Sequence, residues 1–369
     1  SRYNWRKFLI LSATALLQRI KPLHKYGEHR LLIIDDTVES KRGKFIEGSC
    51  KYIWSNKEHR SINALNIVSL NYADSHSTFQ LDFSIKMNDS KRKNISEFTT
   101  KLHNRSNAYK RKYEITKGKN MLAIEMLQRA LDSGVEADYL LVDSWYAKPN
   151  FIEQANELGM PVIARLPNNK HIWNFKGKHK TMNAIYESMK NSRHKSSGRH
   201  GKISYKYFDA IVEHAVLGKV KLVFLHTGKE LLIFISTDIT IAGKEILSTY
   251  KKRWNIEQGY KDLRNLFGFG KEENRIYESL IAKITLSMFT YNIVSYINRI
   301  KHEPQTLGEL FRDLECELET LAISMQLFIQ ILTKISEIEN VVKDNKDLLT
   351  ILAVLNAYTQ KELGFMCES

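Results

Sequence analysis

Acidic residues stand at the ends of two apolar stretches, and a third acid lies in a basic segment. The run "LLIIDDT" ends in Asp35 and Asp36, and "DYLLVD" ends in Asp143. The third acid is Glu257, within "YKKRWNIEQGYKDLR". Oxygen ligands of this kind suit Mg²⁺ or Mn²⁺, which take one or two carboxylates each and keep several waters. Two such ions, roughly 3.5–4 Å apart, can activate an attacking water or hydroxyl and stabilise the leaving 3′ oxygen of a phosphodiester.

The segment around Glu257 has helical spacing. At ~100° per residue one helix would place its polar side chains within an arc of roughly 60°: Tyr250, Arg253, Glu257 and Arg264, with Lys261 close by. An apolar stripe runs beside this arc, so the charged stripe borders the core rather than lying opposite it. A solvated helix face with salt-bridge pairs would account for the same spacing.

The surrounding elements are those needed to bring the acids together. The sequence predicts three strands, a helix, a strand ending in Asp143, a second helix and a further strand, "MPVIARL". This is the element order of an RNase H-like α/β core, in which the first and fourth strands lie side by side. Their terminal side chains would then meet at one edge, and Glu257 from a later helix would complete the cluster.

Five regions follow from the pattern along the chain. They are an N-terminal helical segment (1–29), the first part of the core (30–167), a basic β-rich insertion (168–240), the rest of the core with the third-acid helix and the helix after it (241–300), and a helical C-terminal region (301–369). The apolar run from Ile276 to Ile300 is interrupted by charged and amide residues, so we interpret it as a buried helix.

Composition favours a polyanionic partner. The 369 residues include 56 Lys and Arg against 41 Asp and Glu, a net charge of +15. Two stretches concentrate this charge, with eleven basic residues against three acids in 86–119 and ten against one in 170–206. Each phosphate neutralised by Lys or Arg releases condensed counterions, so such stretches favour nucleic acid. Three widely spaced cysteines argue against a disulfide framework or a zinc site.

Each acid also has an ordinary structural explanation. Asp36 could cap a turn at the end of its strand. Asp143, followed by Ser144 and Pro149, could belong to a helix N-cap. The order of the acids on these elements is what favours a shared site.

Three segments together resemble the DDE transposases of bacterial insertion sequences: "LLIIDDTVESKRGK", "LLVDSWYAKPNFIEQANELGMPVIARL" and "STDITIAGKEILSTYKKRWNIEQGYKDLRNLFGFG". The subgroup is the one whose third carboxylate lies in a Tyr-x2-Arg-x3-Glu-x6-Lys helix. The resemblance covers most of 30–300, and the family likewise carries a β insertion between its second and third acids.

The resemblance implies roles for individual residues. Asp36, Asp143 and Glu257 would be the catalytic ligands of two Mg²⁺ ions, which Mn²⁺ could replace. Tyr250, Arg253, Lys261, Arg264 and Arg165 would contact DNA, and Trp173 is our candidate for the aromatic that holds a flipped base. Arg264 stands where the family has lysine. Asp36 is chosen over Asp35 because it directly precedes Thr37, and it would share a strand face with Ile34 and Leu32.

The function implied is metal-dependent cleavage and strand transfer at transposon ends, by a cut-and-paste route through a DNA hairpin. Its partners would be double-stranded DNA, as terminal inverted repeats and target, and a second copy of the chain in the DNA complex. A cytoplasmic, nucleoid-associated location in bacteria and no membrane partner would follow. The alternatives are an RNase H-like DNA nuclease that cuts without joining and a non-catalytic DNA-binding protein derived from a transposase.

Overall fold

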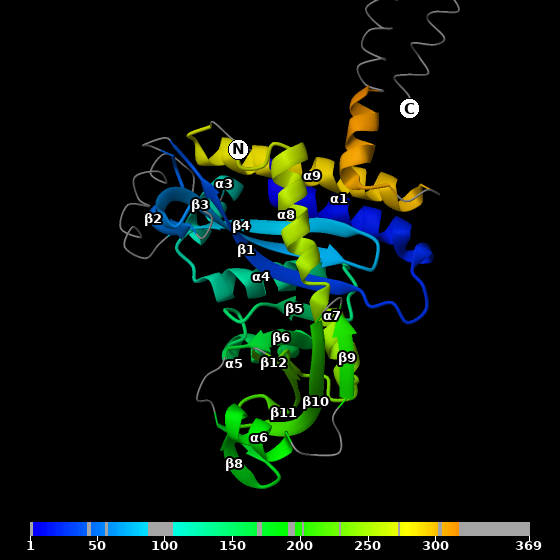
Figure 1. The fold of residues 1–369 in the computed structure, drawn as a ribbon. Coiled ribbons are helices and arrows are strands. Elements are labelled where there is room, and N and C mark those ends of the chain that lie inside the picture. The colour runs from blue at the N-terminus through cyan, green and yellow to red at the C-terminus, as the bar shows by residue number, and fades with distance from the viewer. Residues whose placement is uncertain are drawn as a thin grey trace, which may run out of the picture. The chain divides into compact units, whose positions relative to one another are not determined.

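The structure is a computed structural model, and it describes residues 3–42, 46–55, 58–87, 106–167, 172–190, 196–200, 203–228, 230–271, 274–301 and 305–316. The chain divides into two compact units, Ser1–Leu307 and Gly308–Ser369. The first unit holds all the elements discussed below (Figure 1). In the second, 308–316 is helical, and the remaining helices expected in 301–369 lie outside the described residues.

The described strands of the first unit form one mixed sheet of twelve strands, in the order β2-β3-β1-β5-β6-β12-β11-β10-β7-β8, with β4 beside β3 and β9 beside β10. They are β1 (Leu31–Ser40), β2 (Cys50–Ser55), β3 (Arg60–Ala73), β4 (Thr78–Lys86), β5 (Tyr139–Val142), β6 (Val162–Leu166), β7 (Ile172–Phe175), β8 (Lys178–Thr181), β9 (Ser196–His200), β10 (Ile203–His214), β11 (Gly218–His226) and β12 (Leu231–Ser236). This large mixed sheet with helices fits the RNase H-like fold class.

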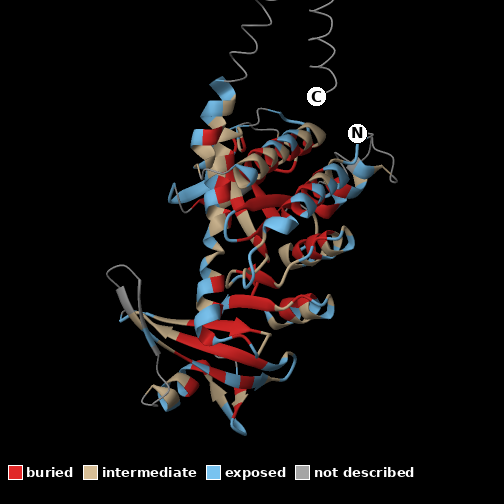
Figure 2. Ribbon diagram, turned by 90° about the vertical axis from the view of Figure 1, so that its right-hand side faces the viewer, coloured by how far each residue is buried: buried red, intermediate tan, exposed pale blue. Residues whose placement is uncertain are grey.

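Helices cover both faces of the sheet. They are α1 (Trp5–Ile20), α3 (Asn107–Glu114), α4 (Lys119–Asp132), α5 (Pro149–Glu157), α6 (Met182–Met189), α7 (Gly243–Lys251), α8 (Trp254–Leu266) and α9 (Tyr277–Ile300), with a short 3₁₀ turn η1 (Lys21–Leu23). Figure 1 shows α8 crossing in front of the strands, and in the turned view of Figure 2 the buried strands lie between α8 and helices on the opposite side.

Strand β1 has a neighbour on each edge and is buried on both faces because helices pack on both sides of the sheet. It pairs antiparallel with β3 and parallel with β5, with Ile34 opposite Val142. The expected neighbours are therefore neighbours in the structure. Leu32 and Ile34 pack in the core under α1, α4 and α5, whereas Leu31 and Ile33 pack in the core under α7, α8 and α9. Alternate side chains of β1 thus pack against the helices on opposite faces of the sheet.

The strands predicted for 168–240 extend the core sheet rather than forming a separate body. Strand β12 pairs antiparallel with β6, with Phe234 opposite Arg165, and β11 and β10 continue outward from β12. The whole range belongs to the first compact unit. The short strands β7, β8 and β9 and the helix α6 in this range were not foreseen.

The segment predicted as one helix from Tyr250 to Arg264 is two helices. Helix α7 ends at Lys251, and α8 begins at Trp254. Between them the N–H groups of Lys252 and Arg253 bond to carbonyls three residues earlier, which tightens the turn and interrupts the α-helical pattern. Tyr250 and Glu257 therefore lie on different helices.

Helix α9 is long and apolar enough to cross a membrane by length and composition alone. In the structure its residues Leu280, Ile284, Met288 and Tyr291 belong to the core under the sheet. The side chain of Asn292 accepts from the backbone N–H of Gln80 at 2.7 Å and donates to its carbonyl at 2.8 Å. These contacts place α9 as a core helix, as predicted for 276–300.

Candidate active site

The side chains of Asp35 and Asp143 stand on neighbouring parallel strands at the same level. The last paired row runs through Ile34 on β1, Val142 on β5 and Ala164 on β6. One residue further along come Asp35 within β1, Asp143 directly after β5 and Arg165 within β6. Because side chains alternate along a strand, this second row shares the face of Ile33, Leu141 and Ile163, which is the face that α8 covers.

Asp36 lies on the opposite face. It shares the face of Leu32 and Ile34, as predicted, but that face is covered by α4 and α5. Its carboxylate receives the ammonium of Lys119, at the start of α4, at 2.6 Å and the hydroxyl of Tyr146 at 3.3 Å. Asp35 is therefore the acid of this pair that lies on the side of Glu257. The role of Asp36 as a metal ligand stays a prediction.

Arg253 joins Asp35 to Glu257. Its Nη1 lies 2.6 Å from Asp35 Oδ2, and its Nη2 lies 2.6 Å from Glu257 Oε1. Arg253 lies in the tight turn before α8. From there its guanidinium reaches Asp35 on β1 and Glu257 in the first turn of α8. Below this bridge, the hydroxyl of Tyr260 bonds to the carbonyl of Asp35 at 3.2 Å and to Ser69 Oγ at 2.7 Å, which anchors α8 to the strands.

Asp35 is largely buried, and the negative charges of Asp143 and Asp36 lie near it. Burial raises the pKa of Asp35 to about 7. Arg253 opposes this shift, whereas the charges of Asp143 and Asp36 add to it. Repulsion among acids at one strand edge is the condition that a bound cation relieves.

The three predicted acids do not form a closed cluster. Among the described residues, no group of three or more His, Cys, Asp and Glu side chains is arranged to hold a metal ion. The guanidinium of Arg253 lies between Asp35 and Glu257, where an ion shared by them would have to bind. The carboxylates on the α8 side of the sheet, those of Asp35, Asp143 and Glu257, are ligands of the kind that suits a hard divalent cation. Metal binding therefore requires Arg253 to release at least one carboxylate.

Tyr250 and Arg165 lie together beside Asp143. The Tyr250 ring packs edge-on against Phe234, with centroids 5.0 Å apart, and Phe234 is the partner of Arg165 in the β6–β12 pairing. Burial raises the pKa of Tyr250, and the nearby charges include Arg253, Asp143 and Arg165. Arg165 is exposed although its strand neighbours are buried. Two of the predicted DNA-contacting residues therefore border the acids.

Arg264 is engaged elsewhere. Its Nε and Nη2 lie 2.9 and 2.7 Å from Glu39 Oε1, and Nη2 also donates to Thr37 Oγ1. Glu39 is buried, so Arg264 compensates a charge on β1 beyond the acidic site. Lys261, the remaining cation of the stripe, is exposed. The cations of the predicted stripe thus have different surroundings. Arg253 contacts the acidic site, Arg264 pairs with Glu39, and Lys261 faces solvent.

Trp173, the tryptophan predicted to hold a flipped base, is buried in this structure. Trp173 is 3% exposed and packs in the core, with its ring centroid 4.9 Å from that of His214. Trp145, two residues after Asp143, is 44% exposed. The ammonium groups of Lys119 and Lys148 lie 5.1 and 4.7 Å from its ring centroid. The sequence signal for Trp145 was its position in "DSWYAKP", directly after a strand-terminal acid.

A model of the family described as DDE superfamily endonuclease matches residues 5–197. The matched range covers just over half of the chain and contains Asp35, Asp36 and Asp143, whereas Glu257 lies beyond it. No curated protein gives a significant match to the chain.

Proposed function

We propose that this chain, which belongs to the DDE superfamily endonucleases, is a metal-dependent DNA transposase that cleaves transposon ends and joins them to target DNA. Endonuclease chemistry comes with the family. The observation that carries the proposal is the juxtaposition of Asp35, Asp143 and Glu257 through a parallel strand pair and the Arg253 bridge. The Tyr-x2-Arg-x3-Glu arrangement around that bridge supports the joining activity and the route through a hairpin, because it carries the resemblance to the transposase subgroup.

Asp35, Asp143 and Glu257 would hold the Mg²⁺ ions, and Mn²⁺ could take the same oxygen ligands. When bound, the ions would activate the attacking water or 3′-hydroxyl and stabilise the leaving 3′ oxygen. This assignment uses Asp35, on the face toward α8, in place of Asp36.

The cations around the acids have the separate task of positioning the DNA strand. Arg253 and Arg165 border Asp143 and Glu257, and both can donate paired N–H groups to a phosphate. With its carboxylate partners held by metal, the guanidinium of Arg253 would be free to contact a phosphate. Tyr250 is held against Phe234, so its hydroxyl is fixed beside the same strand ends.

Trp145 would take the role proposed earlier for Trp173. An exposed indole between two ammonium groups can stack on an unpaired base while the lysines contact the flanking phosphates. Double-stranded DNA is thus the proposed partner, with a second copy of the chain in the complex and a cytoplasmic, nucleoid-associated location.

The test uses a labelled duplex carrying the inverted repeats that flank the coding region, with Mg²⁺ and a target plasmid. Nicking followed by hairpin and joined products would support the transposase. Nicking alone would identify a nuclease, and a gel shift without cleavage would identify a DNA-binding protein. Glu257→Gln is the matched control, because it keeps the shape of the side chain but removes a ligand charge. It should bind the duplex and not cut it.

A further inference from the structure

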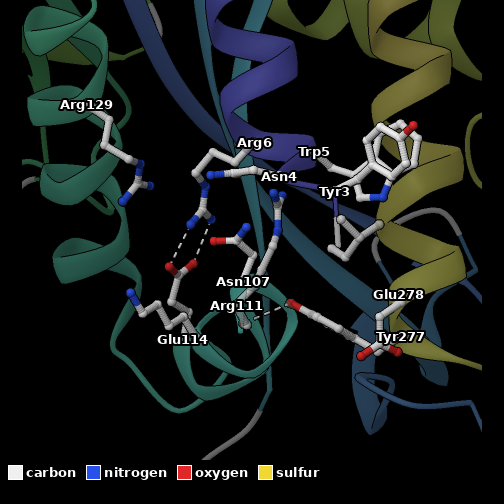
Figure 3. A pocket seen from close by; sticks show the side chains of 12 residues that line it. Tyr3, Asn4, Trp5, Arg6, Asn107, Arg111, Glu114, Arg129, Tyr277 and Glu278 are labelled. Carbon is white, nitrogen blue, oxygen red and sulfur yellow. Dashed lines mark hydrogen bonds and ion pairs between the residues drawn. The ribbon is translucent and has the colours of Figure 1, made fainter. Parts of the chain in front are cut away.

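A second polar site lies at the N-terminal end of α1, away from the residues named above. A cavity of about 250 Å³ opens between the start of α1, helix α3 and the start of α9. Figure 3 shows side chains from these elements and from α4 pointing into it. Arg6, Arg111, Glu114, Arg129 and Tyr277 are among its lining residues.

Two of the three guanidinium groups in this cavity pair with carboxylates. Arg6 bonds to both oxygens of Glu114 at 2.6 Å and to Asp82 Oδ1 at 2.9 Å. Arg129 lies 2.8–2.9 Å from the other oxygen of Asp82. The two acids therefore compensate two arginines. Glu278, at the rim, lies 3.3 Å from the ammonium of Lys112.

Arg111 is the third guanidinium, and no described carboxylate forms an ion pair with it, although the charges of Asp82 and Glu114 favour its charged form. It is 7% exposed, lies over the Phe83 ring at 4.4 Å and donates through Nη2 to the Phe83 carbonyl at 2.9 Å. Its Nε and Nη1 atoms have no hydrogen-bond partner in the part of the chain that the structure describes. Burial, reinforced by the charge of Arg6, lowers the pKa of Arg111 to about 10. A buried cation with two unused donors is costly unless an anion joins it.

We propose that this cavity is an anion site that binds a phosphate group through Nε and Nη1 of Arg111. Adjacent guanidinium N–H groups match the oxygens of a tetrahedral phosphate, and Lys110 at the rim adds a second positive charge. The volume is below the roughly 300–1,000 Å³ of pockets for drug-sized ligands, so a phosphate group fits better than a whole nucleotide. The source is either free phosphate or the terminal phosphate of a DNA strand.

The test is thermal unfolding of the full chain with increasing sodium phosphate at constant ionic strength, balanced with chloride. A ligand that binds only the folded state raises the melting temperature in a concentration-dependent way. Arg111→Met should weaken the apparent phosphate affinity about tenfold or more, as expected for loss of charge-assisted hydrogen bonds. Arg19→Met, which removes an exposed arginine from α1, is the charge-matched control and should retain the parent response.

Arg111→Lys covers the case in which the methionine variant does not fold, because it keeps the charge and loses the paired donors. It should need more phosphate for the same shift. An equal phosphate response in the parent and both Arg111 variants, or none beyond chloride in the parent, would overturn the proposal. The source is resolved by calorimetric titration with short oligonucleotides that carry a 5′-phosphate or a 5′-hydroxyl. Tighter binding of the phosphorylated strand, reduced by Arg111→Met but not by Arg19→Met, identifies a DNA end, and equal binding identifies free phosphate.

Discussion

The guanidinium of Arg253 lies 2.6 Å from the carboxylate of Asp35, and its other arm holds Glu257 at the same distance. One guanidinium thus pairs with two acids that we assign to metal binding. The bridge holds these carboxylates close together, and it implies competition between arginine and metal for the same oxygens.

Arg253→Met should therefore separate the two roles of this residue. Without metal the variant should lose about 1–3 kcal/mol of stability, because two partly buried carboxylates lose a charged partner. Added Mg²⁺ or Mn²⁺ should raise its melting temperature more than that of the parent, since no guanidinium competes with the ion. Cleavage should fall in both metals. Equal metal-induced shifts in the two proteins would show that Arg253 and the ion do not share a site.

Replacing each acid of the β1 pair tests which face carries the chemistry. Asp35→Asn should abolish metal-dependent nicking of terminal DNA, because Asp35 faces Glu257. Asp36→Asn should retain most activity and lose mainly its contact with Lys119. Initial nicking rates at saturating Mg²⁺ give the comparison, with unfolding curves to verify that both variants are folded. The opposite order of activities would reinstate Asp36.

Arg264→Ala should act on stability more than on DNA. The change leaves the buried Glu39 carboxylate without its ion-pair partner, at a cost of about 1–3 kcal/mol in the free energy of unfolding. Adding Glu39→Gln should recover part of the loss, because the unpaired charge is removed. Urea unfolding and terminal-DNA affinity are measured on the same samples. An unchanged unfolding free energy with weakened DNA binding would instead support the phosphate contact that the family resemblance implies.

Trp145→Ala should weaken binding of terminal DNA that carries an unpaired base. Loss of one stacking platform costs about 1–3 kcal/mol per base, and fully paired DNA should be affected less. Trp54→Ala, which removes another exposed indole, is the control. Fluorescence anisotropy on the two DNA forms measures the difference. If both tryptophan variants bind both forms like the parent, a different aromatic holds the base.

The buried network of Asp82 and Glu114 predicts acid sensitivity. Burial raises the pKa of each carboxyl, but the arginines around them outweigh this and hold both below their usual values. Their contribution to stability is therefore present above pH ~4 and lost as the pH falls through the folded-state pKa values. Asp82→Asn should lose about 3–5 kcal/mol at pH 7 and show a flatter decline in acid. Asp132→Asn, at an exposed position, should follow the parent in urea unfolding across this range.

The buried strands could be predicted from sequence because runs such as "LLII" and "YLLV" are apolar on both faces and end in polar residues. The order of the elements along the chain then predicted that the strand containing "LLII" lies beside the strand containing "YLLV". The choice between Asp35 and Asp36 could not be made this way. Both follow the same apolar run, and the answer depends on which face α8 packs against, a contact made by Ile256, Tyr260 and Leu263.

Two further differences have local physical causes. The break between α7 and α8 rests on hydrogen bonds to carbonyls three residues back, and helical periodicity continues through such a turn almost unchanged. Trp173 and Trp145 both stand near basic residues, but β7 packs Trp173 into the core, whereas Trp145 lies in the turn after β5. The two tryptophans differ in burial because of strands distant in the sequence. The spacing of residues along the chain does not reveal this packing.

The pairing of β6 with β12 determines when this sheet can close during synthesis. Strand β6 ends at Leu166, yet its antiparallel neighbour begins only at Leu231. When a nascent chain has been synthesised as far as β6, one edge of that strand stays unpaired until β12 has also been synthesised. Open edges of this kind pair readily with other chains. In the complete chain, β12 from the insertion shields this edge of β6. We therefore expect slow translation between the two strands to favour aggregation.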